Sequence, residues 1–131
     1  MNDVKSILRM DRLVFDKISF ERIGFKNENP LTHSLKASFA KNIKDNMYRV
    51  TLILEGQKKD EYNFEISLTG FFFLDANDKI DSELQNSLIS KNTIAIMMPY
   101  LRSQLSLLTA QPDVDCVVLP PFNINNMLEE K

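Results

Sequence analysis

YNFEISLTGFFF, residues 62–73, is the stretch that decides the fold. Successive side chains of a strand point to opposite faces, so the apolar residues at even positions 62–68 share one face and the polar residues between them share the other. Gly70 has no side chain, which allows a bend or a close approach of another backbone. The run Phe71–Phe73 places rings on both faces. Such a run is typical of plain core, and it predicts an apolar cover on each side, a helix below and a partner chain or ligand above.

Three further strands are predicted before this one. They lie at Leu13–Phe25, Ser34–Phe39 and Met47–Leu54, where apolar and polar residues alternate. A connection of about 8 to 10 residues around Asn27, Asn29 and Pro30 follows the first strand, a polar turn follows the second at 41–47, and a hairpin at 56–60 follows the third. Because all four strands precede any substantial helix, the pattern predicts an antiparallel α+β domain.

The first predicted strand changes its apolar parity. Leu13 and Phe15 fall on one face, whereas the apolar residues at 18 and 20 fall on the other. Either a β-bulge near Asp16 and Lys17 restores the parity, or a partner buries the strand on both faces.

A long helix is predicted from an Asn92 cap to Thr109, after a weaker helical period at 80–89. Pro99 should kink this helix, because proline cannot donate a backbone hydrogen bond. One apolar stripe runs along it, and a second apolar line lies beside the stripe. The stripe consists of Ile94, Met97, Met98, Leu101, Leu105 and Leu108, and the second line of Ile96, Tyr100 and Leu107. Apolar surface on more than one side predicts a partner beyond the helix's own sheet.

Composition predicts one domain over residues 1–131, with an N-terminal arm at 1–10. The chain is 44% hydrophobic and 26% charged, with a net charge of −2. Residues 1–60 carry +4 and residues 61–131 carry −6, too mild an asymmetry for nucleic-acid binding. The lone Cys116 suits a reducing compartment, so a cytoplasmic location is expected. No apolar run is long enough to insert in a membrane, and the N-terminus does not read as a signal peptide.

The end of the chain resembles the SecB protein-export chaperones. Pro99-Tyr100-Leu101-Arg102 and Leu119-Pro120-Pro121-Phe122-Asn123 are similar to the family's P-Y-x-R and L-x-P-x-N signatures. Further back, Ile18-Ser19-Phe20-Glu21 is similar to its I-S-F-E, and Gly70-Phe71-Phe72 to its G-I-F. The motifs occur in order over about residues 10–128.

This resemblance implies a fold and an assembly. The fold is a four-stranded antiparallel sheet, a long helix and a C-terminal helix, here short at 123–131. The assembly is a homotetramer, a dimer of dimers with the long helices between the sheets. In the family an acidic outer patch docks the translocation motor SecA. Glu21 and Glu65 match that patch, whereas Lys17 and Asn63 stand where the family has an acidic and an apolar residue.

The function expected is that of an ATP-independent holdase, which offers hydrophobic grooves to unfolded or precursor polypeptides and needs no cofactor or metal. Its partners are clients for export, with SecA, or a dedicated client of a toxin–antitoxin system. The predicted client-binding residues are Phe25, Leu31, Phe39, Leu119, Phe122, Met127 and Leu128. The predicted oligomer-interface residues are Phe15, Ile18, Phe20, Met97, Tyr100, Leu101, Leu105 and Leu108.

Two other classes of protein compete with this reading. In a structural self-assembling protein the same apolar surface would be used only in oligomer interfaces. An enzyme is not expected, because the sequence has no P-loop, no G-x-S-x-G and no H-E-x-x-H. His33 has no partner motif, and Cys116 is expected to be a small buried residue.

Overall fold

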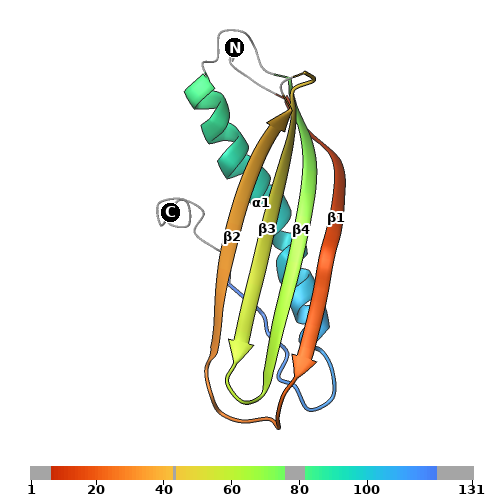
Figure 1. Ribbon diagram of the computed structural model, residues 1–131, viewed down its shortest axis with the longest axis vertical. Helices are drawn as coiled ribbons and strands as arrows, with labels where there is room; N and C mark the ends of the chain where they lie inside the picture. Colours follow the sequence, from red (N-terminus) through yellow and green to blue (C-terminus); the bar gives the residue numbers. More distant parts are fainter. Residues whose placement is uncertain (1–6, 43, 76–81, 121–131) are drawn as a thin grey trace.

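The computed structural model describes residues 7–42, 44–75 and 82–120. One antiparallel sheet is followed by one long helix, which confirms the predicted α+β architecture (Figure 1). The predicted C-terminal helix at 123–131 lies outside the described residues. The elements are β1 (Ile7–Arg22), β2 (Leu31–Asn42), β3 (Met47–Lys58), β4 (Tyr62–Asp75) and α1 (Ser82–Thr109).

The strand order is β1-β4-β3-β2, with every neighbouring pair antiparallel. Two hairpins join β2 to β3 and β3 to β4, whereas β1 reaches the far side of the sheet through the eight-residue connection 23–30. This connection, the crossover loop, has the predicted length. The arrangement is a Greek key that leaves β1 and β2 as the two edge strands.

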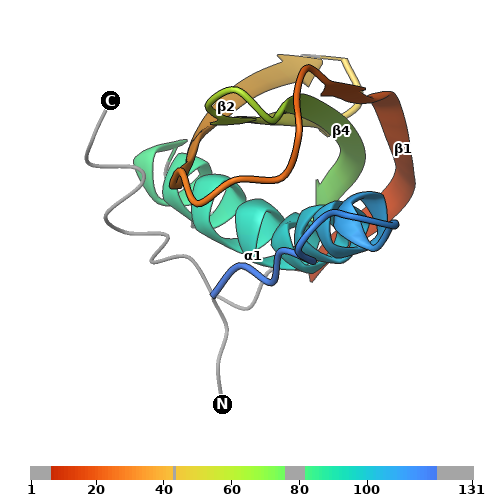
Figure 2. The same cartoon turned by 90° about the horizontal axis from the view of Figure 1, so that it is seen from below.

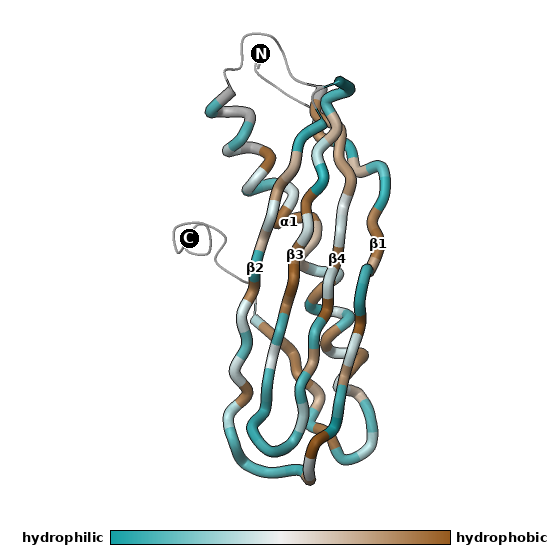
Figure 3. Tube along the Cα trace, viewed as in Figure 1, coloured by the Kyte–Doolittle hydropathy of each residue, from teal (hydrophilic) through white to brown (hydrophobic). Residues whose placement is uncertain are grey.

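The sheet curves around helix α1, which runs diagonally across its concave face from the β2 edge to the β1 edge (Figures 1 and 2). The even-numbered apolar residues of β4 face the helix as predicted, and Ile66 and Leu68 have no exposed surface. Figure 3 shows hydrophobic residues in the middle of β3 and hydrophilic ones at the β3–β4 turn. The core therefore lies between the middle of the sheet and the helix.

A bulge in β1 explains the parity change read from the sequence. The register with β4 shifts between Phe15 and Lys17, so Asp16 is the extra residue. Phe15, Ile18 and Phe20 consequently face the same concave side, opposite Leu68, Ile66 and Phe64. The first of the two alternatives, a bulge near Asp16 and Lys17, is confirmed. A second shift lies between Met10 and Arg12.

The β3–β4 hairpin turns later than predicted, at 59–61 instead of 56–60. Gly56 pairs with Phe64 inside the sheet, and a Cβ at position 56 would lie 2.2 Å from the Phe64 ring. The absence of a side chain there makes room for the ring, so this glycine serves packing and not the turn.

Helix α1 begins at Ser82, ten residues before the predicted Asn92 cap. The two predicted helical segments are one helix. Asn92 is exposed, and beside it the Thr93 hydroxyl donates to the Ile89 carbonyl at 2.5 Å, a bond compatible with a continuous helix. A capping residue can stand inside a helix when packing on both sides holds the turn. Pro99 lies inside α1, and the kink there stays a prediction.

At Gly70 the close approach is made by side chains, and not by another backbone as the sequence predicts. A Cβ on Gly70 would lie 2.7 Å from the Phe72 ring and 3.2 Å from the Met97 sulfur. Phe72 is fully buried in the core. The glycine thus lets Met97 of the helix settle directly on the sheet, which confirms the helical cover predicted for one face of the aromatic run.

Candidate functional site

The crossover loop is tied to the β3–β4 turn by a buried polar cluster, which we call the loop clamp and define as Asn27, Lys58 and Glu61. Lys58 Nζ lies 2.6 Å from Glu61 Oε1 and 2.8 Å from Asn27 Oδ1. The Asn27 N–H donates to Glu61 Oε1 at 3.0 Å. Because Glu61 is only 1% exposed, its charge is stable there only with these donors around it.

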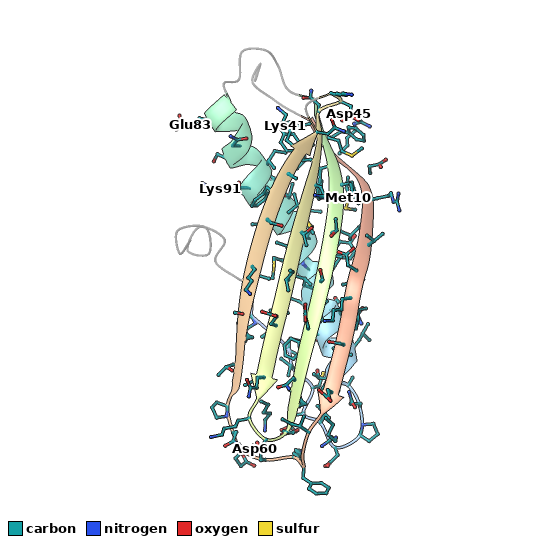
Figure 4. The ribbon with its side chains drawn as sticks, in the orientation of Figure 1. Met10, Lys41, Asp45, Asp60, Glu83 and Lys91 are labelled. Atoms are coloured by element: carbon teal, nitrogen blue, oxygen red, sulfur yellow. The ribbon has the colours of Figure 1, made fainter. Side chains whose placement is uncertain are left out.

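The backbone of the loop also contacts the turn directly. The N–H groups of Ile23 and Gly24 donate to the Glu61 carbonyl at 2.8 and 3.1 Å. A Cβ on Gly24 would lie 2.1 Å from the Asp60 carbonyl oxygen, a backbone atom that cannot swing aside. Asp60 itself has a φ of 64° at the tip of the turn (Figure 4). Only glycine fits where the two segments meet.

Phe25 projects from this tied loop. It is 87% exposed, the largest exposed fraction among the large apolar residues described. The next residue, Lys26, pairs with Asp115 of the segment after α1 at 2.9 Å. Arg22, at the end of β1, donates to the carbonyls of Gly24 and Asp113 at 2.8 and 2.9 Å. The loop is thus held on both sides, and the ring of Phe25 is presented to solvent from a fixed backbone.

These charges shift the pKa of the groups that hold the loop. Burial alone would raise the pKa of Glu61, but hydrogen bonds from Lys58 and the Asn27 N–H offset it, so the pKa lies below its usual value. The hydrogen bond with Asp115 raises the pKa of Lys26, and the same bond lowers the pKa of Asp115. All three groups are therefore charged at neutral pH.

The concave side of β2 continues the apolar surface from the loop. Leu31 and Phe39 are partly buried and pack against the core cluster with Leu35 and Ala37 between them. Within the described residues β2 is an edge strand, so one side of each has no neighbouring strand. Leu31 and Phe39 therefore lie together on the concave side of β2, whereas Phe25 lies on the crossover loop, beside the segment after α1. We call the surface of Leu31 and Phe39 the β2-edge surface.

The segment after α1 folds back onto the helix through side-chain hydrogen bonds to its backbone. Arg102 Nε donates to the Leu119 carbonyl at 3.1 Å, and the Ser106 hydroxyl donates to the Val117 carbonyl at 2.8 Å. The Thr109 hydroxyl accepts from the Val117 N–H at 2.8 Å. The two motif stretches at the end of the chain are thereby brought together, since Arg102 belongs to one and Leu119 to the other.

Leu119 is buried and not free for a client, because only 6% of its surface is exposed. Its neighbour Val118 is 76% exposed, and a hollow of about 510 Å³ lies beside it, lined also by Leu107 and Pro99. Val118 is the apolar residue that sequence reasoning missed in this segment. The predicted client-binding residues Phe122, Met127 and Leu128 lie outside the described residues.

Three helix residues predicted at an oligomer interface belong to the chain's own core. Met97, Leu101 and Leu105 have no exposed surface, because the stripe that they form faces the sheet. They are corrected to core residues, since they have no surface left to give to a partner. Leu108 is partly buried against the same core. Tyr100, on the other line of the helix, is 44% exposed.

The predicted interface residues of β1 remain partly accessible. Ile18 is 43% exposed, and Phe15 packs only partly against the core. The Phe20 ring stacks on Tyr62 with 4.7 Å between ring centroids. Met10, at the other end of the strand, is 41% exposed (Figure 4). The β1 edge thus carries apolar side chains that a single chain leaves incompletely covered.

Glu21 and Glu65 lie on the outer face of the sheet, opposite the helix. Glu65 Oε1 pairs with Lys17 Nζ at 3.0 Å, and Glu21 is exposed opposite Asn63. The lysine that departs from the family's pattern therefore neutralises one of the two glutamates. A hollow of about 690 Å³ covers this part of the outer face.

Two kinds of feature were not found among the residues that the structure describes, a cluster of metal-ligating side chains and a membrane-spanning helix. Within 7–42, 44–75 and 82–120, no three His, Cys, Asp or Glu side chains gather as a metal site. In the same ranges no helix combines the length and the hydropathy that crossing a bilayer requires. Cys116 is exposed, contrary to the expectation that it is buried, because its segment lies on the surface of α1.

The fold is SecB-like. The structure is similar to that of the SecB-like chaperone Rv1957 of Mycobacterium tuberculosis, solved in complex with a ChAD peptide from the Rv1956 HigA1 antitoxin. The TM-score is 0.66 at 14% sequence identity, over 88% of this chain and 91% of that one. A protein of unknown function from Streptococcus agalactiae is similar with a TM-score of 0.55 and 10% identity, over 88% of this chain and 98% of that one.

Sequence comparison adds a further relative of uncharacterized function. An uncharacterized protein of Methanocaldococcus jannaschii is 32% identical over 94 residues, which cover 69% of this chain. The match spans 59% of that protein's length, less than two thirds. No protein-family model matches the chain.

Proposed function

We propose that this chain is an ATP-independent holdase chaperone, a single SecB-like domain that binds unfolded or precursor polypeptides. The observation that carries the proposal is Phe25, an aromatic ring 87% exposed on a loop that the buried Lys58–Glu61 pair holds in place. A fixed backbone under an exposed apolar ring lowers the entropy cost of binding, which is how preorganised sites gain affinity.

The β2-edge surface supplies the rest of the proposed client site. Leu31 and Phe39 lie on the concave side of β2 and are only partly buried, so part of their apolar surface is accessible. Phe122, Met127 and Leu128 of the last residues would complete the site. Contacts of this kind select for apolar surface and not for sequence, as a holdase requires. The neighbour of similar fold was solved with an antitoxin peptide, which supports a polypeptide client, dedicated or in export.

Self-assembly is the second part of the proposal. The β1 edge carries Ile18 and Met10, each more than two fifths exposed, and an unpaired edge strand is a template for another strand. We expect two β1 edges to pair in a dimer and the exposed helix line, with Tyr100, to join dimers into a tetramer. The class of structural self-assembling proteins would use the same surfaces but leave none for a client.

The test is suppression of aggregation by the purified protein without nucleotide. At equimolar concentration it should prevent a chemically denatured client from aggregating, and Phe25→Ser should lose most of this activity. Phe25 is largely exposed, so the melting temperature should change little. Ile53→Ser is the matched control, because Ile53 is partly exposed on the outer face of the sheet, between Lys36 and Ser67 and away from the proposed client site.

Two outcomes of these assays would contradict the proposal. Normal aggregation of several clients, with no binding of a hydrophobic dye by the oligomer, would assign the apolar surface to self-assembly alone. Equal activity of the Phe25→Ser and wild-type proteins would instead move the client site away from the crossover loop.

A further inference from the structure

The outer face of the sheet carries a basic and aromatic surface at the end away from the crossover loop. Along one row of the register, Arg12 of β1, Phe71 of β4 and Arg49 of β3 lie side by side. In the next row Arg9 lies beside Phe73. Because directly paired residues share a face, the Phe71 ring lies between two arginines and the Phe73 ring lies between Arg9 and Met47. We call this surface the arginine rows and define it as Arg9, Arg12, Arg49, Phe71 and Phe73.

The rings and the cations are in contact. The guanidinium carbon of Arg9 lies 5.5 Å from the centre of the Phe73 ring, and that of Arg12 lies 5.8 Å from the centre of Phe71. Both distances are within the range of cation–π attraction. Arg12 and Arg49 are exposed and Phe71 is half-buried, so the surface offers both charge and apolar area to solvent.

A hollow of about 580 Å³ lies on the same outer face of the sheet. Arg12, Arg49 and Phe71 line it, and Asp16 of the bulge is the acidic group in its lining. The Asp16 carboxylate already accepts from the hydroxyls of Thr69 at 2.5 Å and Ser67 at 3.5 Å. Its hydrogen-bonding capacity is thus partly used within the sheet.

We propose that the arginine rows bind an acidic segment of a partner protein, with carboxylates on Arg12 and Arg49 and an apolar side chain on Phe71. Arg12 and Arg49 lie two strands apart, which is roughly 10 Å at the usual strand spacing. Carboxylates two to four positions apart in an extended peptide would span this distance. Arginine forms directional, charge-assisted bonds with carboxylates, so charge complementarity selects the occupant.

A polypeptide fits this surface better than a nucleic acid does. The other half of the same face carries Glu21, Glu55 and Glu65. These carboxylates would repel the phosphates of a nucleic acid that extended along the sheet. Nucleic-acid binding relies on many phosphate contacts, typically about 6 to 10. A short acidic segment can end within the basic half. The surface lies on the face opposite the proposed client site, so the inference goes beyond the proposed function.

The test uses a fluorescein-labelled peptide of repeating Asp-Gly-Phe-Gly units and fluorescence anisotropy with the full chain. Binding should weaken about tenfold or more in the double variant Arg12→Gln/Arg49→Gln, and it should weaken as the salt is raised. The matched control is Lys17→Gln/Lys36→Gln, which removes two outer-face lysines that already pair with glutamates. That control and Phe25→Ser should bind as the wild type does.

A second variant and two further ligands separate charge from other causes of binding. Arg12→Lys/Arg49→Lys keeps the charge and should restore much of the salt-dependent binding, and a peptide with Asn in place of Asp should not bind. No binding of the acidic peptide, binding that survives Arg12→Gln/Arg49→Gln, or equal loss in the lysine control would overturn the inference. Tighter binding of single-stranded DNA, lost in the same double variant, would assign the surface to nucleic acid and also overturn it.

Discussion

The two faces of this one sheet are built by the same alternation of side chains but are completed differently. On the concave face the even positions of β4 are covered by α1, and Leu68 and Phe72 have no exposed surface. On the outer face no element of the described chain lies over the odd positions, and the Arg12 guanidinium lies over the Phe71 ring. The apolar face is thus covered from within the chain, whereas two aromatic rings of the polar face lie beside arginine side chains and remain partly exposed.

The largest effect is expected when a core residue of the covered face is removed. Leu101→Ala should destabilise the chain by about 3 kcal/mol, because it leaves a cavity between α1 and the sheet at a side chain with no exposed surface. Leu107→Ala, on the exposed side of the same helix, should change stability by less than about 0.5 kcal/mol. Denaturant unfolding of both variants measures the difference, and equal losses would mean that the helix is not seated as described.

A smaller loss is expected where the covered face meets the crossover loop. Glu61→Gln removes the charge opposite Lys58 but keeps an acceptor, so we expect a loss of about 2 kcal/mol, below the about 3 to 5 kcal/mol of a fully broken buried pair. Suppression of client aggregation should also weaken, because the loop that presents Phe25 is then less firmly held. Lys36→Gln, which breaks the exposed pair with Glu55, is the control.

Glu61 should also make the free energy of unfolding depend on pH in the acidic range. Its pKa is lower in the folded chain than the ordinary value of 4.5, so the folded state binds its proton less readily than the unfolded state. The stabilisation is fully present above the ordinary pKa and is lost as the pH falls through the lowered one. Between about pH 5 and pH 3 the wild type should therefore lose more stability than Glu61→Gln. Parallel losses would show that the buried pair does not form.

The elements that could be predicted from sequence are those with a local signal. The alternation in Tyr62–Phe73 predicts which side of β4 is buried. The parity change in β1 predicts either a bulge near Asp16 and Lys17 or burial on both faces, and the structure selects the bulge. The start of α1 is not predicted, because Asn92 reads as a cap unless the packing of both halves of the helix is known. The β3–β4 turn is misplaced for the same reason, since only the pairing with Phe64 shows that Gly56 lies within the sheet.

The candidate site was predicted less completely than the fold. Phe25 is among the residues that the sequence predicts for the client site, but the clamp of its loop joins Asn27 to Lys58 and Glu61, about 30 residues away. No spacing rule relates such residues before the strand order is known. The arginine rows were missed likewise, because Arg12 and Arg49 meet only through their pairing with Phe71. Met97, Leu101 and Leu105 were assigned to an interface because periodicity alone does not say what covers a stripe.

The smallest effect is expected on the outer face, where charge reversal tests whether the two faces act independently. Glu21→Lys/Glu65→Lys breaks the pair with Lys17, whose side chain is 55% exposed. Exposed pairs contribute about 0 to 1 kcal/mol, so folding should be nearly unchanged. Client binding should also be unchanged, because the proposed client site lies on the concave side, whereas docking of a motor protein at the glutamates would weaken. Aggregation assays and denaturant unfolding measure both effects. If this double variant loses client binding while Phe25→Ser keeps it, the client site lies on the outer face and the functions proposed for the two faces must be exchanged.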